Sequence, residues 1–309
     1  MPPANRHNPQ RAKSSQSLYS LNEFLREFPD DETCLEYLWR ERHSADGIHA
    51  DCPKCERSRE FKRYATAQRR QSWTCTGCGH HIHPTAGTIF EKSSRPLTDW
   101  FYVMFLVSSS RCGVAAKQVE RELGVNYKTA WRMLNKVRNA LMDESNEPPL
   151  SGTVEVDETY MGAKRKRGTP RGRPGPGSHK TPVFGAVERG GRIVARVIPD
   201  ATALTLRTNI KSFVMPASMI FTDEYQPYRR ITKDGYFHRR VNHSQRIYVA
   251  GNVHTNTIEG FFGHFKNDVR GTHHSISRRW LDSYLKEHRS FVLAVVPLPS
   301  PLGACCAVP

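Results

Sequence analysis

The spacing of hydrophobic residues changes along the chain. Up to about residue 142, apolar side chains recur every three or four positions within 18–44 and 97–142, which predicts helices, with a break at Pro29. Beyond about residue 150, short β-rich runs replace them: TVEVDETYMG, PVFGAVER, RIVARVIPD and SMIFTDEY. Helical spacing returns near 203–215, 255–269 and 278–292. The pattern therefore predicts a helical front part followed by an α/β domain.

The second helical block predicts a helix-turn-helix. Val119, Leu123 and Val125 mark a short helix and its turn, and apolar residues then repeat from Ala130 through Leu141. Asn126 can cap the longer helix, whose polar face carries Lys128, Arg132, Asn135, Lys136 and Arg138. Such a helix normally enters the DNA major groove, and the expected base contacts near its N-terminus are Tyr127, Lys128, Thr129 and Arg132. A helical hairpin with a solvated basic face is the alternative.

Four cysteines stand in two pairs, Cys52 with Cys55 and Cys75 with Cys78, with 19 residues between the pairs. Two such knuckles complete a tetrahedral four-sulfur site, so we expect structural Zn²⁺. Four thiolates leave no open coordination position for catalysis. The remaining four cysteines are scattered, and the whole pattern favours metal binding in a reducing cytosol over disulfides.

The chain is strongly basic. Its 309 residues carry 46 Lys and Arg against 30 Asp and Glu, a formal charge of +16. This surplus favours a polyanionic partner, although a basic peripheral membrane protein would share it. No apolar stretch of membrane-spanning length appears, so we expect no membrane partner. The stretch 164–180 has seven Lys or Arg and no acid. It predicts either a solvated insertion or, as we favour, a phosphate-gripping loop with Lys164, Arg165, Lys166 and Arg167 as contacts.

Three acidic residues come at the ends of apolar runs or on a helix. Strand alternation places Asp157 on the face opposite Val154 and Val156, and Asp223 closes a similar β-rich run. Glu259 lies on an amphipathic helix. Two strand carboxylates and one helix carboxylate can hold two Mg²⁺ ions for phosphodiester chemistry. The rival candidates are their neighbours Glu155, Glu158 and Glu224, of which Glu155 shares the face of Asp157.

These motifs together make the chain resemble bacterial insertion-sequence transposases of the DDE type, in the subgroup with an N-terminal zinc ribbon and helix-turn-helix. The resemblance rests on VEVDETYMG, MIFTDEYQPY and VHTNTIEGFFGHFKNDVRGTHHSIS, and on CPKC, WTCTGCG and ELGVNYKTAWRML in the front half. It implies an RNase H-like fold, a mixed five-stranded sheet flanked by helices. The first acid would lie on the first strand, the second after the fourth strand and the third on a later helix.

The resemblance also implies Mg²⁺ or Mn²⁺ as catalytic cofactor and the roles of nearby residues. Members can use an asparagine near the third acid and a lysine downstream, which Asn256 and Lys266 match. The third metal ligand is therefore Glu259 or Asn256, and we favour Glu259 because a carboxylate binds Mg²⁺ more strongly. Lys266 would hold a phosphate.

The expected organisation has five parts. They are a disordered basic tail (1–17), N-terminal helices with the zinc ribbon (18–92), the helix-turn-helix (93–147), the catalytic domain (152–292) and an apolar, proline-rich tail (293–309) that departs from the family pattern. The resemblance implies a cytoplasmic, nucleoid-associated enzyme that cleaves the terminal inverted repeats of its element and joins the 3′-OH to target DNA, as a homo-oligomer. The alternatives are a non-enzymatic DNA-binding regulator and a metal-dependent nuclease without strand transfer.

Overall fold

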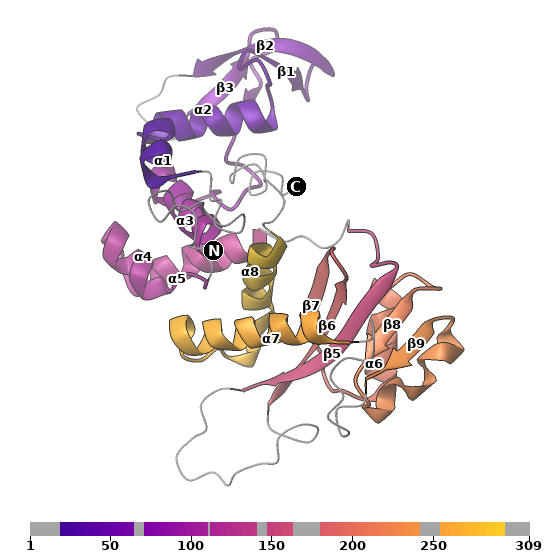
Figure 1. The fold of residues 1–309 in the computed structure, drawn as a ribbon. Coiled ribbons are helices and arrows are strands. Elements are labelled where there is room, and N and C mark those ends of the chain that lie inside the picture. Colours follow the sequence, from indigo (N-terminus) through magenta and orange to yellow (C-terminus); the bar gives the residue numbers. More distant parts are fainter. Residues whose placement is uncertain are drawn as a thin grey trace, which may run out of the picture. The chain divides into compact units, whose positions relative to one another are not determined.

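A computed structural model describes residues 19–64, 71–110, 112–140, 147–162, 180–241 and 254–293 (Figure 1). The chain forms two compact units, which we describe separately. Of the described residues, the first unit contains 19–110 and 119–140, and the second contains 112–118 and 147–293. The basic stretch 164–179, with its four predicted DNA contacts, lies outside the described residues, as does the tail from residue 294.

Two helices open the first unit, on either side of Pro29 as predicted. Helix α1 (Leu21–Glu27) starts at a capping box formed by Ser20 and Glu23, and α2 (Asp31–Arg42) is capped by Asp30. The aromatic ring of Phe24 is buried, whereas the Leu25 side chain is 53% exposed. The apolar stripe of α1 is therefore narrower than its spacing predicted.

A small antiparallel sheet follows α2. Its strands, in spatial order, are β1 (His49–Cys52), β2 (Arg57–Tyr64), β3 (Ser72–Cys75) and β4 (His81–Ile82). The indole of Trp39 on α2 stacks on that of Trp73 in β3, with ring centroids 4.9 Å apart. This contact packs the sheet against the helix.

Three helices complete the first unit: α3 (Leu97–Ser109), α4 (Ala116–Leu123), which belongs to it from Val119 onward, and α5 (Tyr127–Ala140). Gly124 adopts a positive φ of 60° in the turn between α4 and α5. The Asn126 side chain accepts a hydrogen bond of 2.8 Å from the backbone N–H of Thr129, which caps α5 as predicted.

The second unit is built on a five-stranded mixed sheet. Its strands are β5 (Thr153–Met161), β6 (Thr181–Glu188), β7 (Ile193–Val197), β8 (Met219–Thr222) and β9 (Phe237–Arg240). The spatial order is β7-β6-β5-β8-β9, with β5, β6 and β7 antiparallel to one another, and β8 and β9 parallel to β5. This is the RNase H-like arrangement, and it confirms the predicted fold class.

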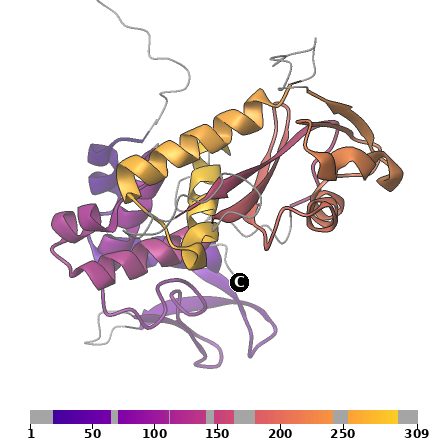
Figure 2. The ribbon, with the colours of Figure 1, turned by 90° about the horizontal axis from the view of Figure 1, so that it is seen from below.

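Helices cover both faces of this sheet (Figures 1 and 2). On one face, α6 (Ala203–Phe213) and the 3-10 helix η2 (Gln226–Asp234) bury a core with Val154, Val156 and Ile220. On the other face, α7 (Asn256–Asp268) and α8 (Leu281–Leu293) bury a core with Val183 and Val187. A turn of π-helix (Val269–His273) and a short 3-10 helix (Arg278–Trp280) lie between α7 and α8. Among the helices of the described residues, none combines the length and the apolar character that a membrane crossing requires.

Candidate active site and metal centre

Strand pairing places the first two acidic residues beside each other. Strands β5 and β8 run parallel with Val154 opposite Ile220 and Glu155 opposite Phe221. Continuing this register by two residues leads from Glu155 to Asp157 and from Phe221 to Asp223, just past the end of β8, and the charge of Asp223 does act on Asp157. The backbone N–H of Tyr225 donates a 2.9 Å hydrogen bond to Asp223 Oδ1, which fixes this carboxylate just beyond the end of β8.

The third acidic residue reaches the same region from α7. Burial raises the pKa of Asp157 well above its usual value, and the charges of Glu158, Asp223 and Glu259 raise it further. Asp223 and Glu259 therefore both lie within electrostatic reach of Asp157. The hydroxyl of Thr255 donates a 2.6 Å hydrogen bond to Glu259 Oε1 and orients that side chain.

This set of oxygen donors fits divalent cations, because a bound cation would offset both the burial and the neighbouring negative charges that raise the Asp157 pKa. Among the described residues, only the four paired cysteines bring three or more candidate ligand atoms within 4.8 Å of one another. The three carboxylates are thus spaced more widely than the ligands of a single ion. That spacing is compatible with a pair of ions, which themselves stand about 3.5–4 Å apart in two-metal sites.

Two further residues from the predicted set flank the carboxylates. Burial lowers the pKa of Lys266, and the charge of Asp157 acts in the opposite direction, so the ammonium group lies in the field of that carboxylate. Asn256 is exposed at the first position of α7, one turn before Glu259. Asn256 thus begins α7 and Lys266 lies in its last turn, so the two residues flank Glu259 on opposite sides along the helix.

A fourth carboxylate, Glu158, lies next to Asp157 on β5. Burial raises its pKa to about 7, while a 2.6 Å hydrogen bond from the Tyr228 hydroxyl acts to lower it and the charge of Asp223 to raise it. The buried Tyr228 holds Glu158 toward the η2 side of the sheet. Glu158 thus adds a fourth ionisable carboxyl group beside Asp157.

Glu155, which the sequence left as a rival metal ligand, has a different role. Its side chain is fully buried and accepts hydrogen bonds from the backbone N–H groups of Thr257 (2.8 Å) and Ile258 (3.2 Å). The Arg189 guanidinium pairs with it at 2.8 Å, and His254 Nδ1 lies 3.2 Å from it. Glu155 therefore caps α7 from within the sheet, and α7 carries Glu259.

Gly185 allows α7 to lie close to the sheet, a role that sequence reasoning missed. It stands opposite Asp157 in the β5–β6 ladder. A Cβ atom at this position would come within 2.5 Å of the Phe262 ring and 2.7 Å of the Ile258 side chain. The available signal was a glycine within the otherwise apolar strand PVFGAVE, since such a glycine often marks a close approach.

The four paired cysteines form a separate metal centre in the first unit. Cys52 Sγ lies 3.6 Å from Cys78 Sγ, and Cys55 Sγ lies 3.9 Å from Cys75 Sγ. A tetrahedral zinc site with Zn–S bonds of about 2.3 Å requires sulfurs roughly 3.8 Å apart, so the cluster fits zinc. Nearby, His81 is held by a 2.9 Å hydrogen bond to Thr74 and lies outside the cluster.

Helix α5 presents a shorter basic face than predicted. Tyr127, Lys128 and Arg132 are exposed, and Thr129 is half-buried. The expectation for the second half of the helix was wrong: Arg138 is 1% exposed, and Lys136 donates a 2.9 Å hydrogen bond to the carbonyl of Ile89. Lys136 is thus bound to the segment before α3, and Arg138 is withdrawn from solvent. The candidate DNA contacts therefore concentrate at the N-terminal end.

Comparisons with known proteins agree with this architecture. Residues 149–289 match the ISXO2-like transposase domain. A protein in transposable element ISH50 of Halobacterium salinarum is 31% identical over 247 residues, covering 75% of this chain and 78% of that protein. A transposase-like protein of Haemophilus influenzae is 27% identical over 96 residues, or 31% of this chain and 76% of that protein.

Two solved structures show a looser likeness. The catalytic core domain of BIV integrase has a TM-score of 0.30 and 16% identity, covering 46% of this chain and 82% of that chain. The Mos1 strand transfer complex has a TM-score of 0.25 and 12% identity, covering 66% of this chain and 78% of that chain. The family-model match and the ISH50 relative establish the family: the chain belongs to the DDE transposases of insertion sequences, with an ISXO2-like transposase domain.

Proposed function

We propose that this chain binds the terminal inverted repeats of an insertion sequence, cleaves the DNA strand there and joins the freed 3′-OH to target DNA. One observation carries the proposal: the three acids converge on one place. Burial, and then the charges of Glu158, Asp223 and Glu259, raise the pKa of Asp157, and the parallel pairing of β5 with β8 brings the end of β8 beside Asp157. A cluster of acids that solvent can reach, with one pKa strongly raised, suits divalent-metal chemistry on phosphates.

Asp157, Asp223 and Glu259 would hold the catalytic metal, Mg²⁺ or Mn²⁺, which when bound polarises the scissile phosphate and activates the attacking oxygen. Asp157 and Asp223 supply fixed ligands, since strand pairing and the Tyr225 N–H set their positions. Lys266, close to Asp157, would contact a phosphate oxygen and offset negative charge on the DNA.

The third ligand is assigned to Glu259 over Asn256. Glu259 acts on the Asp157 pKa and is oriented by the Thr255 hydroxyl. Asn256 would then position DNA or a metal-bound water from the start of α7. Glu259→Gln should abolish cleavage, whereas Asn256→Ala should reduce it by less; the reverse order would make Asn256 the ligand.

DNA selection is assigned to the front of the chain. In this division, two front domains recognise the element's ends: the zinc ribbon domain (18–92) and the helix-turn-helix domain (93–147). The zinc ligands are Cys52, Cys55, Cys75 and Cys78. The domain at 152–292 carries out the chemistry. The supporting observation is the exposed N-terminal end of α5, with Tyr127, Lys128 and Arg132. Lys164 to Arg167 would add phosphate contacts, and a homo-oligomer would join two ends in a nucleoid-associated, cytoplasmic complex.

The test uses the full chain and DNA carrying the inverted repeats that flank its gene. Asp157→Asn and Asp223→Asn should lose strand cleavage and strand transfer with Mg²⁺ while keeping wild-type affinity for the repeats. Unchanged function in both variants would favour a non-enzymatic regulator. Products of hydrolysis alone, with a pre-cleaved end supplied, would favour a nuclease.

A further inference from the structure

A pocket of about 720 Å³ opens beside the candidate active site. It is lined by Glu224, Tyr225, Gln226, Arg229, Arg240 and Val241. Its first lining residue directly follows Asp223. Arg240 stands opposite Thr222, the residue before Asp223, in the β8–β9 ladder. The pocket therefore begins at the residue that follows Asp223.

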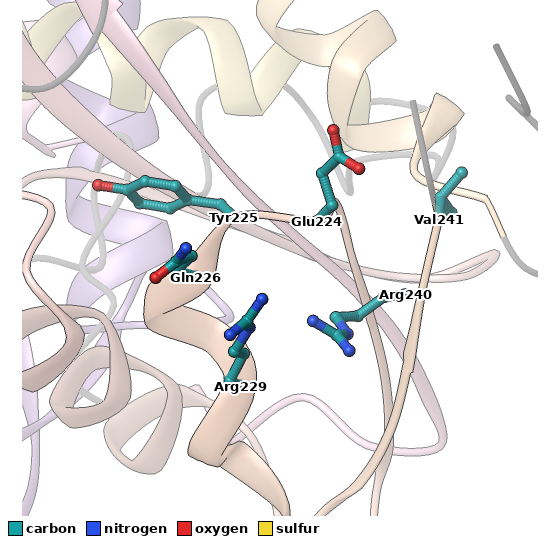
Figure 3. Close-up of a pocket in the computed structure, with 6 residues that line it drawn as sticks. All are labelled: Glu224, Tyr225, Gln226, Arg229, Arg240 and Val241. Atoms are coloured by element: carbon teal, nitrogen blue, oxygen red, sulfur yellow. The ribbon is translucent and has the colours of Figure 1, made fainter. Parts of the chain in front are cut away.

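Two positive charges converge inside this pocket. Arg229 comes from η2 and Arg240 from the last position of β9. In Figure 3 their guanidinium groups point toward each other across the pocket, while the Glu224 carboxylate points away from both. Neither guanidinium forms an ion pair with another residue in the part of the chain that the structure describes. Like charges that face each other in this way favour an anion between them.

The nearby acid does not supply that anion. Asp234, at the end of η2, is bound by Arg207 Nη2 at 2.6 Å and by Lys211 Nζ at 2.7 Å, both from α6. These partners hold its pKa below the usual value for an aspartate. Within the segments that the structure describes, no ion pair neutralises Arg229 or Arg240, so their positive charge is available to a ligand.

We infer that Arg229 and Arg240 clamp a DNA phosphodiester adjacent to the one at Asp157 and Asp223. A guanidinium matches the oxygens of a phosphate in a two-point contact, which suits this geometry. The pocket is also larger than one phosphate group requires, so a nucleotide of a continuing strand fits it. The strand is either the element's end or the target DNA, since both present the same backbone. This inference rests on the proposed function.

The test compares Arg229→Gln, Arg240→Gln and the double variant with Arg230→Gln, an exposed neighbour on η2 that does not line the pocket. Each pocket variant should raise the DNA concentration needed for half-saturation roughly tenfold, as expected for a lost charge-assisted contact. The slope of log affinity against log salt should fall by about one per arginine. Arg→Lys variants, which keep the charge, should retain the salt slope and lose part of the affinity.

A chemical version of the test locates the phosphate. Single neutral methylphosphonate linkages are placed next to the scissile phosphate in the end DNA, or along a short target duplex used with a pre-cleaved end. At one position, the neutral linkage should slow cleavage or strand transfer by the wild type. The same linkage should cause no further slowing in the double variant, which has already lost the contact. The substrate in which this happens identifies the strand.

Two outcomes would overturn the inference: pocket variants that behave like Arg230→Gln, or variants that lose activity with unchanged affinity and salt slope. Failure of the proposed function looks different. The wild type would then neither cleave nor transfer DNA, yet the salt slope of DNA binding would still report whether the two arginines contact phosphate.

Discussion

Removing the buried carboxylate of Glu155 should loosen α7 and with it the third acidic residue. Glu155 is fully buried, and its carboxylate accepts hydrogen bonds from the backbone N–H groups of Thr257 and Ile258 and from the Thr257 hydroxyl at 3.1 Å. It also pairs with the Arg189 guanidinium at 2.8 Å. Glu155→Ala leaves the Arg189 charge and these donors without their acceptor. Breaking a buried pair by removing one partner costs about 3–5 kcal/mol. Glu155→Gln keeps the shape and one acceptor oxygen, and should cost about 1–3 kcal/mol.

Hydrogen exchange of peptides that cover residues 256–268 measures this effect locally. Because about 1.4 kcal/mol corresponds to a factor of ten, Glu155→Ala should speed amide exchange in α7 by roughly two to four orders of magnitude, and Glu155→Gln by less. DNA cleavage should fall in both variants while affinity for DNA stays unchanged, since Glu155 positions Glu259 without touching substrate.

Two comparisons separate this cap from a general loss of stability. Glu188→Gln, at the end of the neighbouring strand β6, removes a carboxylate bonded to Ser151 and should leave α7 protected. In a double-mutant cycle, Arg189→Met should cost much less in the Glu155→Gln background than alone, because the two side chains share one interaction. Unchanged exchange of α7 in Glu155→Ala would refute the reasoning.

Three further outcomes are expected. Gly185→Ala should lower thermal stability and displace α7, because the new Cβ would come within 2.5 Å of the Phe262 ring. Gly260→Ala, with open space around it, should leave stability equal or higher. Equal melting temperatures for the two variants would contradict the packing. Chelation of zinc, or Cys75→Ser, should unfold the small sheet, measured by circular dichroism, and weaken DNA binding, measured by gel shift. An unchanged sheet would argue against structural zinc. Asp234→Asn should cost about 1–3 kcal/mol at pH 7. The folded-state pKa of Asp234 is depressed, so the difference in unfolding free energy between wild type and variant should shrink as the pH falls below about 4, the ordinary aspartate pKa. Urea unfolding measures this difference. A difference that does not change with pH would contradict a contribution from the Asp234 charge.

The sequence predicted the fold class because each local pattern agreed with the tertiary structure. The period-two alternation in TVEVDETYMG placed Val154 and Val156 in one core, as the structure has them. The apolar stripe of α7, including Ile258 and Phe262, faces the sheet as its spacing indicated. Cysteine spacing likewise predicted a cluster of four sulfurs, because two short knuckles restrict where the thiols can lie.

Other features depend on contacts between distant segments, which spacing does not reveal. Glu155 and Asp157 share a strand face, and only the position of α7 shows that one caps a helix and the other faces the second strand carboxylate. Arg138 looks solvent-exposed on a helical wheel, yet it is 1% exposed in the folded chain. The convergence of Arg229 and Arg240 follows from β9 lying beside β8, a pairing the sequence did not specify.

The parallel pairing of β5 with β8 also governs which changes in length the family can accept. Asp157 and Asp223 meet because both strands run the same way and are aligned residue by residue. Segments that link strands can gain or lose residues without moving either acid. One residue inserted into β8 before Asp223 would turn its side chain to the opposite face of the sheet. Divergent copies of such elements should therefore vary in length between strands and keep constant the count of residues within them.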